Sequence, residues 1–245
     1  MTHLFPKDVS ADGYRIDHLI VVTLVFVTLL FLVMVAWMVA SYLRGRKRPV
    51  AWAAPGPRDK ILPLALASCV LVVVDGNLFF HSTSDVEEIY WNFKAAEADP
   101  NVVRIEINAH QWAWDARYAG PDGQFGTSDD VVTLNDIRVP KGAPVVFQLA
   151  AVDVIHSFYL PNFRVKMDAL PGAVHKLWIR AQETGQFEIA CAQHCGVNHY
   201  KMRGTLTVLE PEQYRAWLRE AAAASARAFD PEDAQAHWGW AWKEP

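Results

Sequence analysis

The sequence predicts a two-helix membrane hairpin, an all-β outer domain and a short C-terminal helix. Two apolar runs stand near the N-terminus, and seven short segments rich in Val, Ile and aromatic residues follow them. The composition agrees with a folded chain, since 52% of the 245 residues are hydrophobic and 20% are charged. Disordered chains have few apolar residues and much charge, so that class is excluded.

The two apolar runs predict membrane spans. Residues 19–43 carry no charge, and residues 61–80 carry a single acid, Asp75. About 20 apolar residues cross a bilayer as a helix, so both runs are long enough. The alternative for each run is a buried core helix. For Asp75 two positions stay open, one inside the span against a partner helix or water, the other near the outer headgroups.

Basic residues between the two runs predict the orientation of the hairpin. The first 17 residues contain only two basic residues. The loop contains one acid and six basic residues, which are Arg44, Arg46, Lys47, Arg48, Arg58 and Lys60. Loops rich in Lys and Arg stay in the cytoplasm, so both termini are expected outside. We therefore expect the chain in the inner (plasma) membrane, with its soluble domain on the periplasmic or outer face.

Short segments between turn residues predict the strands of a sandwich or barrel. The expected strands are residues 102–107, 131–139, 144–149, 154–160, 175–180, 186–190 and 204–209. Pro211 then opens an Ala-rich stretch that predicts a helix to about residue 228. The expected organisation is a segment with the hairpin (1–80), the β domain (81–210), and a helix with a Trp-rich tail (211–245).

The outer part of the chain is acidic. Residues 81–245 contain 22 acidic and 15 basic residues, a net charge of −7, against −4 for the whole chain. An acidic surface speeds encounter with a basic partner, although such a charge can also serve solubility alone. The same balance makes a nucleic-acid partner unexpected.

Residues 191–202, Cys-Ala-Gln-His-Cys-Gly-Val-Asn-His-Tyr-Lys-Met, concentrate side chains that bind metals. Thiolate and thioether ligands suit copper, imidazole suits copper or zinc, and a thioether is a poor zinc ligand. Cys191 and Cys195, four positions apart, can bridge two copper ions, each of which then needs its own His. His199 is one candidate, and His156 in an apolar strand is the other. Met202 supplies the thioether.

Three other interpretations of this loop use only part of the pattern. The two thiols could form an extracellular disulfide. They could form a redox pair, but the usual Cys-x-x-Cys spacing is absent. They could bind structural zinc together with His194 and His199.

The segment resembles the binuclear copper (CuA) loop of cytochrome c oxidase subunit II, Cys-x-Glu-x-Cys-Gly-x-x-His-x-x-Met. Residues 110–114 (His-Gln-Trp-Ala-Trp), 153–157 (Asp-Val-Ile-His-Ser) and 166–172 (Lys-Met-Asp-Ala-Leu-Pro-Gly) resemble further motifs of that family, in the same order. The resemblance covers roughly residues 17–210. It implies that the β domain is a cupredoxin-like Greek-key sandwich.

The resemblance implies six copper ligands. Two are thiolates that bridge the two metals, and each copper has two further ligands of its own. The six are Cys191 and Cys195 as bridges, His156 with Met202 on one copper, and His199 with the main-chain carbonyl of Gln193 on the other. Trp112 matches the position that receives the electron from cytochrome c.

One residue departs from the family pattern. Gln193 stands where the family usually has Glu, whose side chain helps to hold magnesium at the junction with subunit I. An amide oxygen is a neutral and weaker ligand for a hard cation. Copper binding through the main-chain oxygen is expected to persist, whereas the magnesium site of the family is not assigned to this chain.

The resemblance implies an electron-transfer subunit of a haem-copper terminal oxidase. Electrons would pass from cytochrome c to copper and then to haem in subunit I, where oxygen is reduced; subunit III is a further expected partner. No nucleophile–base arrangement or Cys-x-x-Cys-His haem motif occurs in the sequence. Two alternatives stay open, the copper subunit of a nitric-oxide reductase and a membrane-tethered copper carrier.

Residues 122–130 are acidic and rich in Gly. They lack the alternating acids of an EF-hand loop, so a solvated hairpin loop is favoured over a calcium site.

Overall fold

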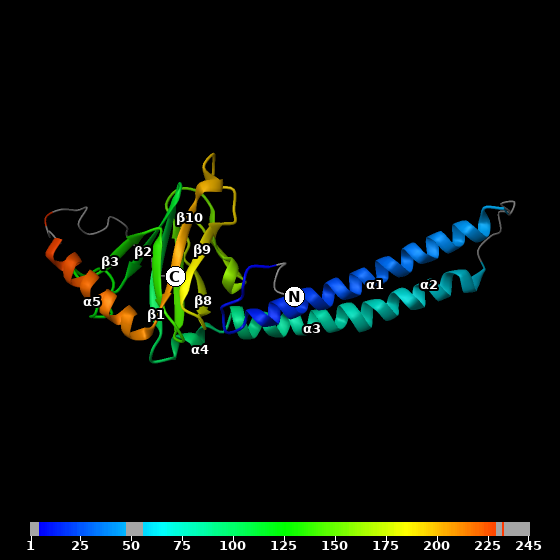
Figure 1. Cartoon of the computed structure of the whole chain (residues 1–245), viewed down its shortest axis with the longest axis horizontal. Helices are drawn as coiled ribbons and strands as arrows, with labels where there is room; N and C mark the ends of the chain where they lie inside the picture. The colour runs from blue at the N-terminus through cyan, green and yellow to red at the C-terminus, as the bar shows by residue number, and fades with distance from the viewer. Residues whose placement is uncertain (1–4, 48–55, 229–231, 233–245) are drawn as a thin grey trace. The chain divides into compact units, whose positions relative to one another are not determined.

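A computed structural model describes residues 5–47, 56–228 and 232 (Figure 1). The chain forms two compact units, one of Met1–Tyr14 with Asn92–Pro245 and one of Arg15–Trp91. The predicted fold class is confirmed by two apolar helical runs, a sandwich of two β-sheets and a C-terminal helix. The Trp-rich tail lies outside the described residues, and the division at residues 80 and 210 stays a prediction.

Two helical runs make up the smaller unit, and both are long and apolar enough to cross a membrane. The first is α1 (Gly13–Gly45). The second continues through α2 (Pro57–Val70), the π-helical segment η1 (Leu71–Asp75), α3 (Gly76–Asp85) and the π-helical segment η2 (Val86–Tyr90). The runs are antiparallel (Figure 1). Both extend past the predicted spans, because helical hydrogen bonding continues into the polar flanks.

An ion-pair cluster joins the two runs at one end. Arg15, near the start of α1, lies 3.2 Å from the carboxylate of Asp85 and 2.6 Å from that of Glu88. These pairs fix the level at which α1 and the second run face each other.

Two five-stranded sheets form the sandwich, in the orders β3-β2-β1-β5-β8 and β4-β10-β9-β6-β7. Parallel pairing of β1 with β5 and of β4 with β10 gives the Greek-key crossovers. The strands are β1 (Val103–His110), β2 (Ala113–Tyr118), β3 (Val131–Leu134), β4 (Asp136–Pro140), β5 (Pro144–Ala151), β6 (His156–Leu160), β7 (Val165–Ala169), β8 (His175–Arg180), β9 (Gly185–Cys191) and β10 (Arg203–Leu209).

Aromatic side chains fill the core between the sheets. Trp114 of β2 packs edge-to-face on Phe158 of β6, with ring centroids 5.2 Å apart. Phe147 of β5 lies 5.3 Å from the same ring. All three side chains are fully buried. They connect the first sheet to β6, the strand that carries the candidate ligand His156.

The prediction of one strand over residues 131–139 is wrong. Asn135 divides it into β3 and β4, which belong to different sheets. Its backbone is left-handed (φ 57°), a conformation that Asn tolerates better than most residues. The Asn135 side-chain oxygen also accepts a hydrogen bond from the backbone N–H of Trp114 (2.9 Å). The Asn135 side chain thus stabilises the point at which the chain passes from one sheet to the other.

Strands β2 and β7 were not predicted from the sequence. The sequence of β2 does not show the alternation of buried apolar and exposed polar residues that predicts a strand, because the charged residue Arg117 is only 5% exposed. Its guanidinium is paired with Glu106 of the neighbouring β1. Burial raises the pKa of Glu106, and the Arg117 charge opposes that rise.

Residues 6–11, ahead of α1, pack on the sandwich. Val9 is buried, its backbone N–H donates to the carbonyl of Asn162 (3.0 Å), and its own carbonyl accepts from Gln182 (2.8 Å). This segment continues directly into α1.

Helix α5 (Pro211–Ala228) has the predicted bounds and packs on β3, β4 and β10. Trp217 lies edge-to-face on Tyr118, with centroids 5.2 Å apart, and also contacts Tyr214. The guanidinium of Arg138 stands 5.1 Å from the Trp217 ring. Trp217 is therefore the main anchor of α5 on the sandwich.

Replacing Trp217 by Ala should lower the free energy of unfolding of the sandwich by about 2 kcal/mol, because the aromatic and cation contacts of α5 are lost. Denaturant unfolding followed by circular dichroism measures this change. Glu220→Ala, on an exposed position of the same helix, is the matched control and should change it by less than about 0.5 kcal/mol. Equal losses in the two variants would contradict the anchoring role.

Candidate metal centre

The loop between β9 and β10 carries most of the candidate ligands. β9 ends at Cys191, and η4 (His199–Lys201) precedes β10. β6 begins at His156 and pairs with β9, with Phe158 opposite Cys191. The backbone N–H of Ala192 then donates to the carbonyl of Ser157 (3.0 Å). This pairing brings His156 beside the start of the loop.

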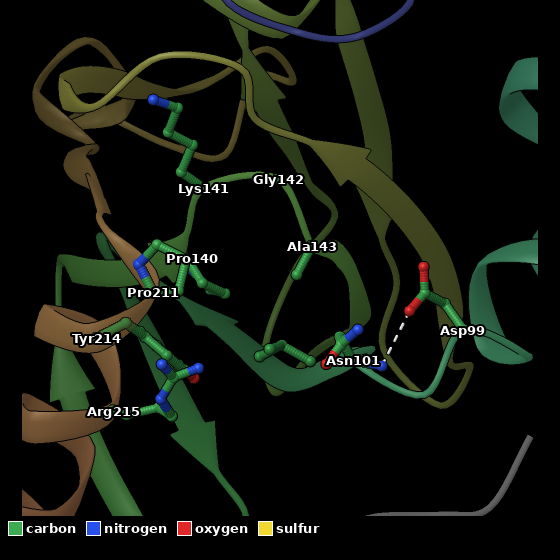
Figure 2. Close-up of a pocket in the computed structure, with 10 residues that line it drawn as sticks. Asp99, Asn101, Pro140, Lys141, Gly142, Ala143, Pro211, Tyr214 and Arg215 are labelled. Carbon is green, nitrogen blue, oxygen red and sulfur yellow. Dashed lines mark hydrogen bonds between the residues drawn. The ribbon is translucent and has the colours of Figure 1, made fainter.

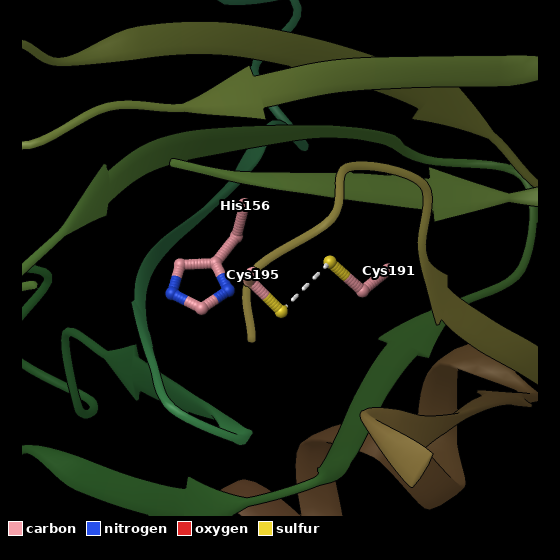
Figure 3. Close-up of side chains that lie close together, drawn as sticks. All are labelled: His156, Cys191 and Cys195. Carbon is pink, nitrogen blue, oxygen red and sulfur yellow. Dashed lines mark hydrogen bonds between the residues drawn. The ribbon is translucent and has the colours of Figure 1, made fainter. Parts of the chain in front are cut away.

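His156, Cys191 and Cys195 point into one small space (Figure 3). One ligand atom from each lies within 4.8 Å of the others. The two Sγ atoms are 3.8 Å apart, whereas a disulfide needs about 2.05 Å. Over the described ranges, this is the one group of three His, Cys, Asp or Glu side chains close enough to share a metal ion.

Met202 closes the buried side of this space. Its Sδ lies 3.2 Å from Nδ1 of His156 and 3.7 Å from Sγ of Cys195. The exposed fractions of His156, Cys195 and Met202 are 0%, 3% and 1%. Three of the candidate ligands are therefore shielded from water.

His199 and Gln193 reach the same space from the outer side. Nδ1 of His199 lies 3.6 Å from Sγ of Cys195, and the carbonyl oxygen of Gln193 lies 3.1 Å from Sγ of Cys191. His194 packs edge-to-face against His199, with ring centroids 5.5 Å apart. The structure thus brings together all six groups implied by the resemblance.

Asp153 orients the buried imidazole. Its Oδ1 lies 2.9 Å from Nε2 of His156, so Nδ1 is the nitrogen that faces the sulfur atoms. The other oxygen, Oδ2, accepts from the backbone N–H of Gln111 (2.7 Å). A carboxylate on the remote nitrogen fixes the ring and makes it a better metal ligand. Asp153 stands three residues from His156, a spacing that could have indicated this role.

Trp112 lies against the ligand loop. A Cβ on Gly196 would come within 3.3 Å of the Trp112 ring and 2.7 Å of the Gln111 amide nitrogen, so the close approach requires glycine. Gly196 also has φ +121°, which L side chains rarely adopt. The Gln111 amide donates to the carbonyl of Cys195 (2.7 Å). Sequence reasoning did not single out Gln111, which the fold places between Trp112 and the loop.

The two thiols differ in acidity. Burial alone would raise the pKa of Cys191, but hydrogen bonds with His156 and the backbone of Ser157 stabilise its thiolate and lower the pKa to about 6. Burial and the neighbouring Cys191 thiolate raise the pKa of Cys195 to about 12. The metal-free site therefore favours one thiolate over two. A bound cation would compensate the second negative charge.

The donor set fits copper. Two thiol sulfurs, two imidazole nitrogens, a thioether and one carbonyl oxygen surround the space. Soft sulfur with imidazole is the ligand type that copper prefers, and four-coordinate zinc would leave the thioether unused.

Two other features of the outer domain do not form such a site. A cavity of about 450 Å³ lies between Asp99, Lys141 and Tyr214 (Figure 2), where Lys141 pairs with Glu210 (3.2 Å). The acidic loop at residues 122–130 connects β2 to β3, and its carboxylates accept hydrogen bonds from within the loop.

Residues 103–208 match the family described as the periplasmic domain of cytochrome c oxidase subunit II. The β-sandwich domain of the chain belongs to this family.

Members of the subunit II family from several bacteria are similar to the chain. The alternative cytochrome c oxidase subunit 2 of Bradyrhizobium diazoefficiens is 39% identical over 154 residues, which cover 54% of this chain and 55% of that protein. The cytochrome c oxidase subunit 2 of Cereibacter sphaeroides is 29% identical over 240 residues, covering 86% and 74%. The crystal structure of the periplasmic domain of subunit II of cytochrome oxidase from Bradyrhizobium japonicum is 31% identical, with 51% and 96% covered and a TM-score of 0.45.

The cytochrome c oxidase subunit 2 of Alkalihalophilus pseudofirmus is 34% identical over 161 residues. The chain covers 44% of that protein and 55% of the Bradyrhizobium diazoefficiens protein, so it spans about half the length of these two relatives. Membership in the subunit II family implies a copper centre, and the loop of residues 191–202 supplies side chains of the required kinds. The two membrane-length helical runs agree with a membrane protein whose soluble part is the matched periplasmic domain.

In the metal-free chain, iodoacetamide should label Cys191 faster than Cys195 at pH 7, because the thiolate is the reactive form. The Cys191 rate should rise between pH 5 and 7 and then level off, since its lowered pKa is about 6. Cys195 should stay protonated and slow across this range. Mass spectrometry of the two peptides measures both rates.

His156→Ala is the control for this assignment, because it removes the hydrogen bond that stabilises the Cys191 thiolate. The variant should shift the Cys191 profile toward higher pH. A profile centred near pH 9 in the unaltered chain would contradict the electrostatics described above.

Proposed function

We propose that the chain is the electron-accepting subunit of a haem-copper terminal oxidase. The observation that carries the proposal is the convergence of two thiols, two imidazoles and a thioether at the loop between β9 and β10. Cytochrome c would be the donor, and haem in subunit I, where oxygen is reduced, would be the acceptor. The oxidase would thus be an oxidoreductase whose oxygen chemistry belongs to another subunit.

We assign the ligand roles as the resemblance implies. Cys191 and Cys195 would hold both coppers, His156 and Met202 would complete one copper, and His199 and the Gln193 carbonyl would complete the other. When bound, a thiolate-bridged copper pair takes up and releases one electron with little change in geometry.

The chain's own groups suit that task because they are held before any metal binds. Asp153 fixes the ring of His156, and the pairing of β6 with β9 fixes its distance from the loop. Burial of Met202 and Cys195 keeps water out. A rigid, dry set of ligands requires little rearrangement when charge changes.

A copper carrier is less compatible with this arrangement. Exchange of a metal requires accessible ligands, whereas His156, Cys195 and Met202 are almost fully buried. The chain would serve a nitric-oxide reductase with the same geometry, so only the catalytic subunit that it accompanies separates that alternative from an oxidase.

We do not assign magnesium to this chain. Gln193 is exposed and offers a neutral amide where a carboxylate would bind a hard cation more strongly.

The membrane placement completes the proposal. The helical hairpin would lie in the inner (plasma) membrane against subunit I, and subunit III would be a second membrane partner. A nucleic-acid partner is not expected. The outer domain would face the periplasm, where its excess of acidic residues would attract a basic cytochrome c.

Trp112 is the residue through which we expect electrons to enter. Trp112→Leu in the intact oxidase should slow reduction by cytochrome c by about tenfold or more, roughly 1.4 kcal/mol of activation free energy. The copper spectrum should remain, because Trp112 is not a ligand. Stopped-flow absorbance measures the rate.

Trp178→Leu is the matched control, since Trp178 lies on β8, the edge strand that β5 separates from β1, and should leave the rate unchanged. An unchanged rate in Trp112→Leu, with copper bound, would contradict electron transfer through this residue.

A further inference from the structure

Asp75 places a carboxylate within the apolar second helical run. It is the last residue of η1, and its side chain is exposed. The preceding residues Val72 and Val73 are 71% and 63% exposed, as expected for a surface that faces lipid or another protein. Across the described part of the chain, no hydrogen bond or ion pair reaches the Asp75 side chain.

The ion pairs of Arg15 establish the depth of Asp75. Arg15 stands level with Asp85, and Asp75 lies ten residues further into the run, about 15 Å at 1.5 Å per residue. The apolar part of α1 begins at Leu19, only four residues or about 6 Å from Arg15. Asp75 therefore lies about 9 Å inside the apolar layer, and not at the headgroups.

Local geometry gives Asp75 a defined face. Gly76 N–H donates to the carbonyl of Leu71, an i→i+5 bond that marks a π-helical turn, a feature often found at functional sites. Along α3, Phe79 and Ser82 follow at i+4 and i+7, so they share the Asp75 face. Phe79 is 72% exposed.

We propose that the face formed by Asp75, Phe79 and Ser82 binds a transmembrane helix of a partner oxidase subunit, which presents a basic side chain to the Asp75 carboxylate. An intramembrane acid needs a donor, and lipid tails offer none. A symmetric contact with a second copy would bring like charges together. The inference rests on the membrane placement and oxidase assembly proposed above.

The first test uses the full chain, tagged and purified from membranes with its oxidase partners. Asp75→Leu should reduce the amount of partner subunit retained per chain after detergent dilution by about three- to tenfold. Asp75→Asn, which keeps a polar group, should retain an intermediate amount. Val73→Leu is the matched control at a similar depth and should retain as much as the unaltered chain.

Unchanged retention in Asp75→Leu, or an equal loss in Val73→Leu, would overturn the inference. If the unaltered chain retains no partner, the assembly part of the proposed function fails as well. Retention by the unaltered chain with no effect of Asp75→Leu removes this inference alone.

The second test identifies the occupant. A photo-crosslinking phenylalanine analogue at position 79 keeps Asp75 and reports what lies beside it. The expected adduct is a peptide from a transmembrane helix of a partner subunit that contains Lys, Arg or His. An adduct with a second copy, with lipid only, or no adduct overturns the inference.

Discussion

The pairing of β6 with β9 is the constraint on which the candidate metal centre depends. It joins a strand that begins with His156 to a strand that ends with Cys191, although the two residues are far apart in the chain. Everything else at the site is arranged around this contact. The loop after β9 returns through η4 to β10, and so carries Cys195, His199 and Met202 back over the same space.

A hydrogen-bonded network then fixes the orientation of the ligand side chains and of the loop. Asp153 holds His156 from one side and the backbone of Gln111 from the other, while the Gln111 side chain holds the Cys195 carbonyl. The segment that carries Trp112 is thereby tied to both parts of the ligand set. Such ties on buried ligands favour one geometry over alternatives, which is what rapid electron transfer requires.

The sequence predicted what depends on local spacing. The ligand loop was recognisable because Cys191, Cys195, His199 and Met202 fall within twelve residues. The helix from Pro211 was predicted to its last residue, because its start signal and Ala-rich composition agree. His156 was a candidate only because the loop required a second imidazole.

Long-range contacts explain what the sequence did not predict. β2 was missed because Arg117 is buried, and only its partner Glu106 on another strand makes that burial possible. The change of sheet at Asn135 interrupts a run that looks continuous. Gln111 gained a role only when the fold brought it to Cys195, 84 positions away. The depth of Asp75 depended on the pairing of Arg15 with residues of the second helical run.

Electron paramagnetic resonance of the copper-loaded, partly oxidised chain tests the central claim most directly. A copper pair bridged by two thiolates would share one unpaired electron equally between its two nuclei. The account therefore predicts a hyperfine pattern from two equivalent coppers, with two copper ions bound per chain. A pattern from one copper nucleus would contradict the bridged site, even if copper were bound by the same loop.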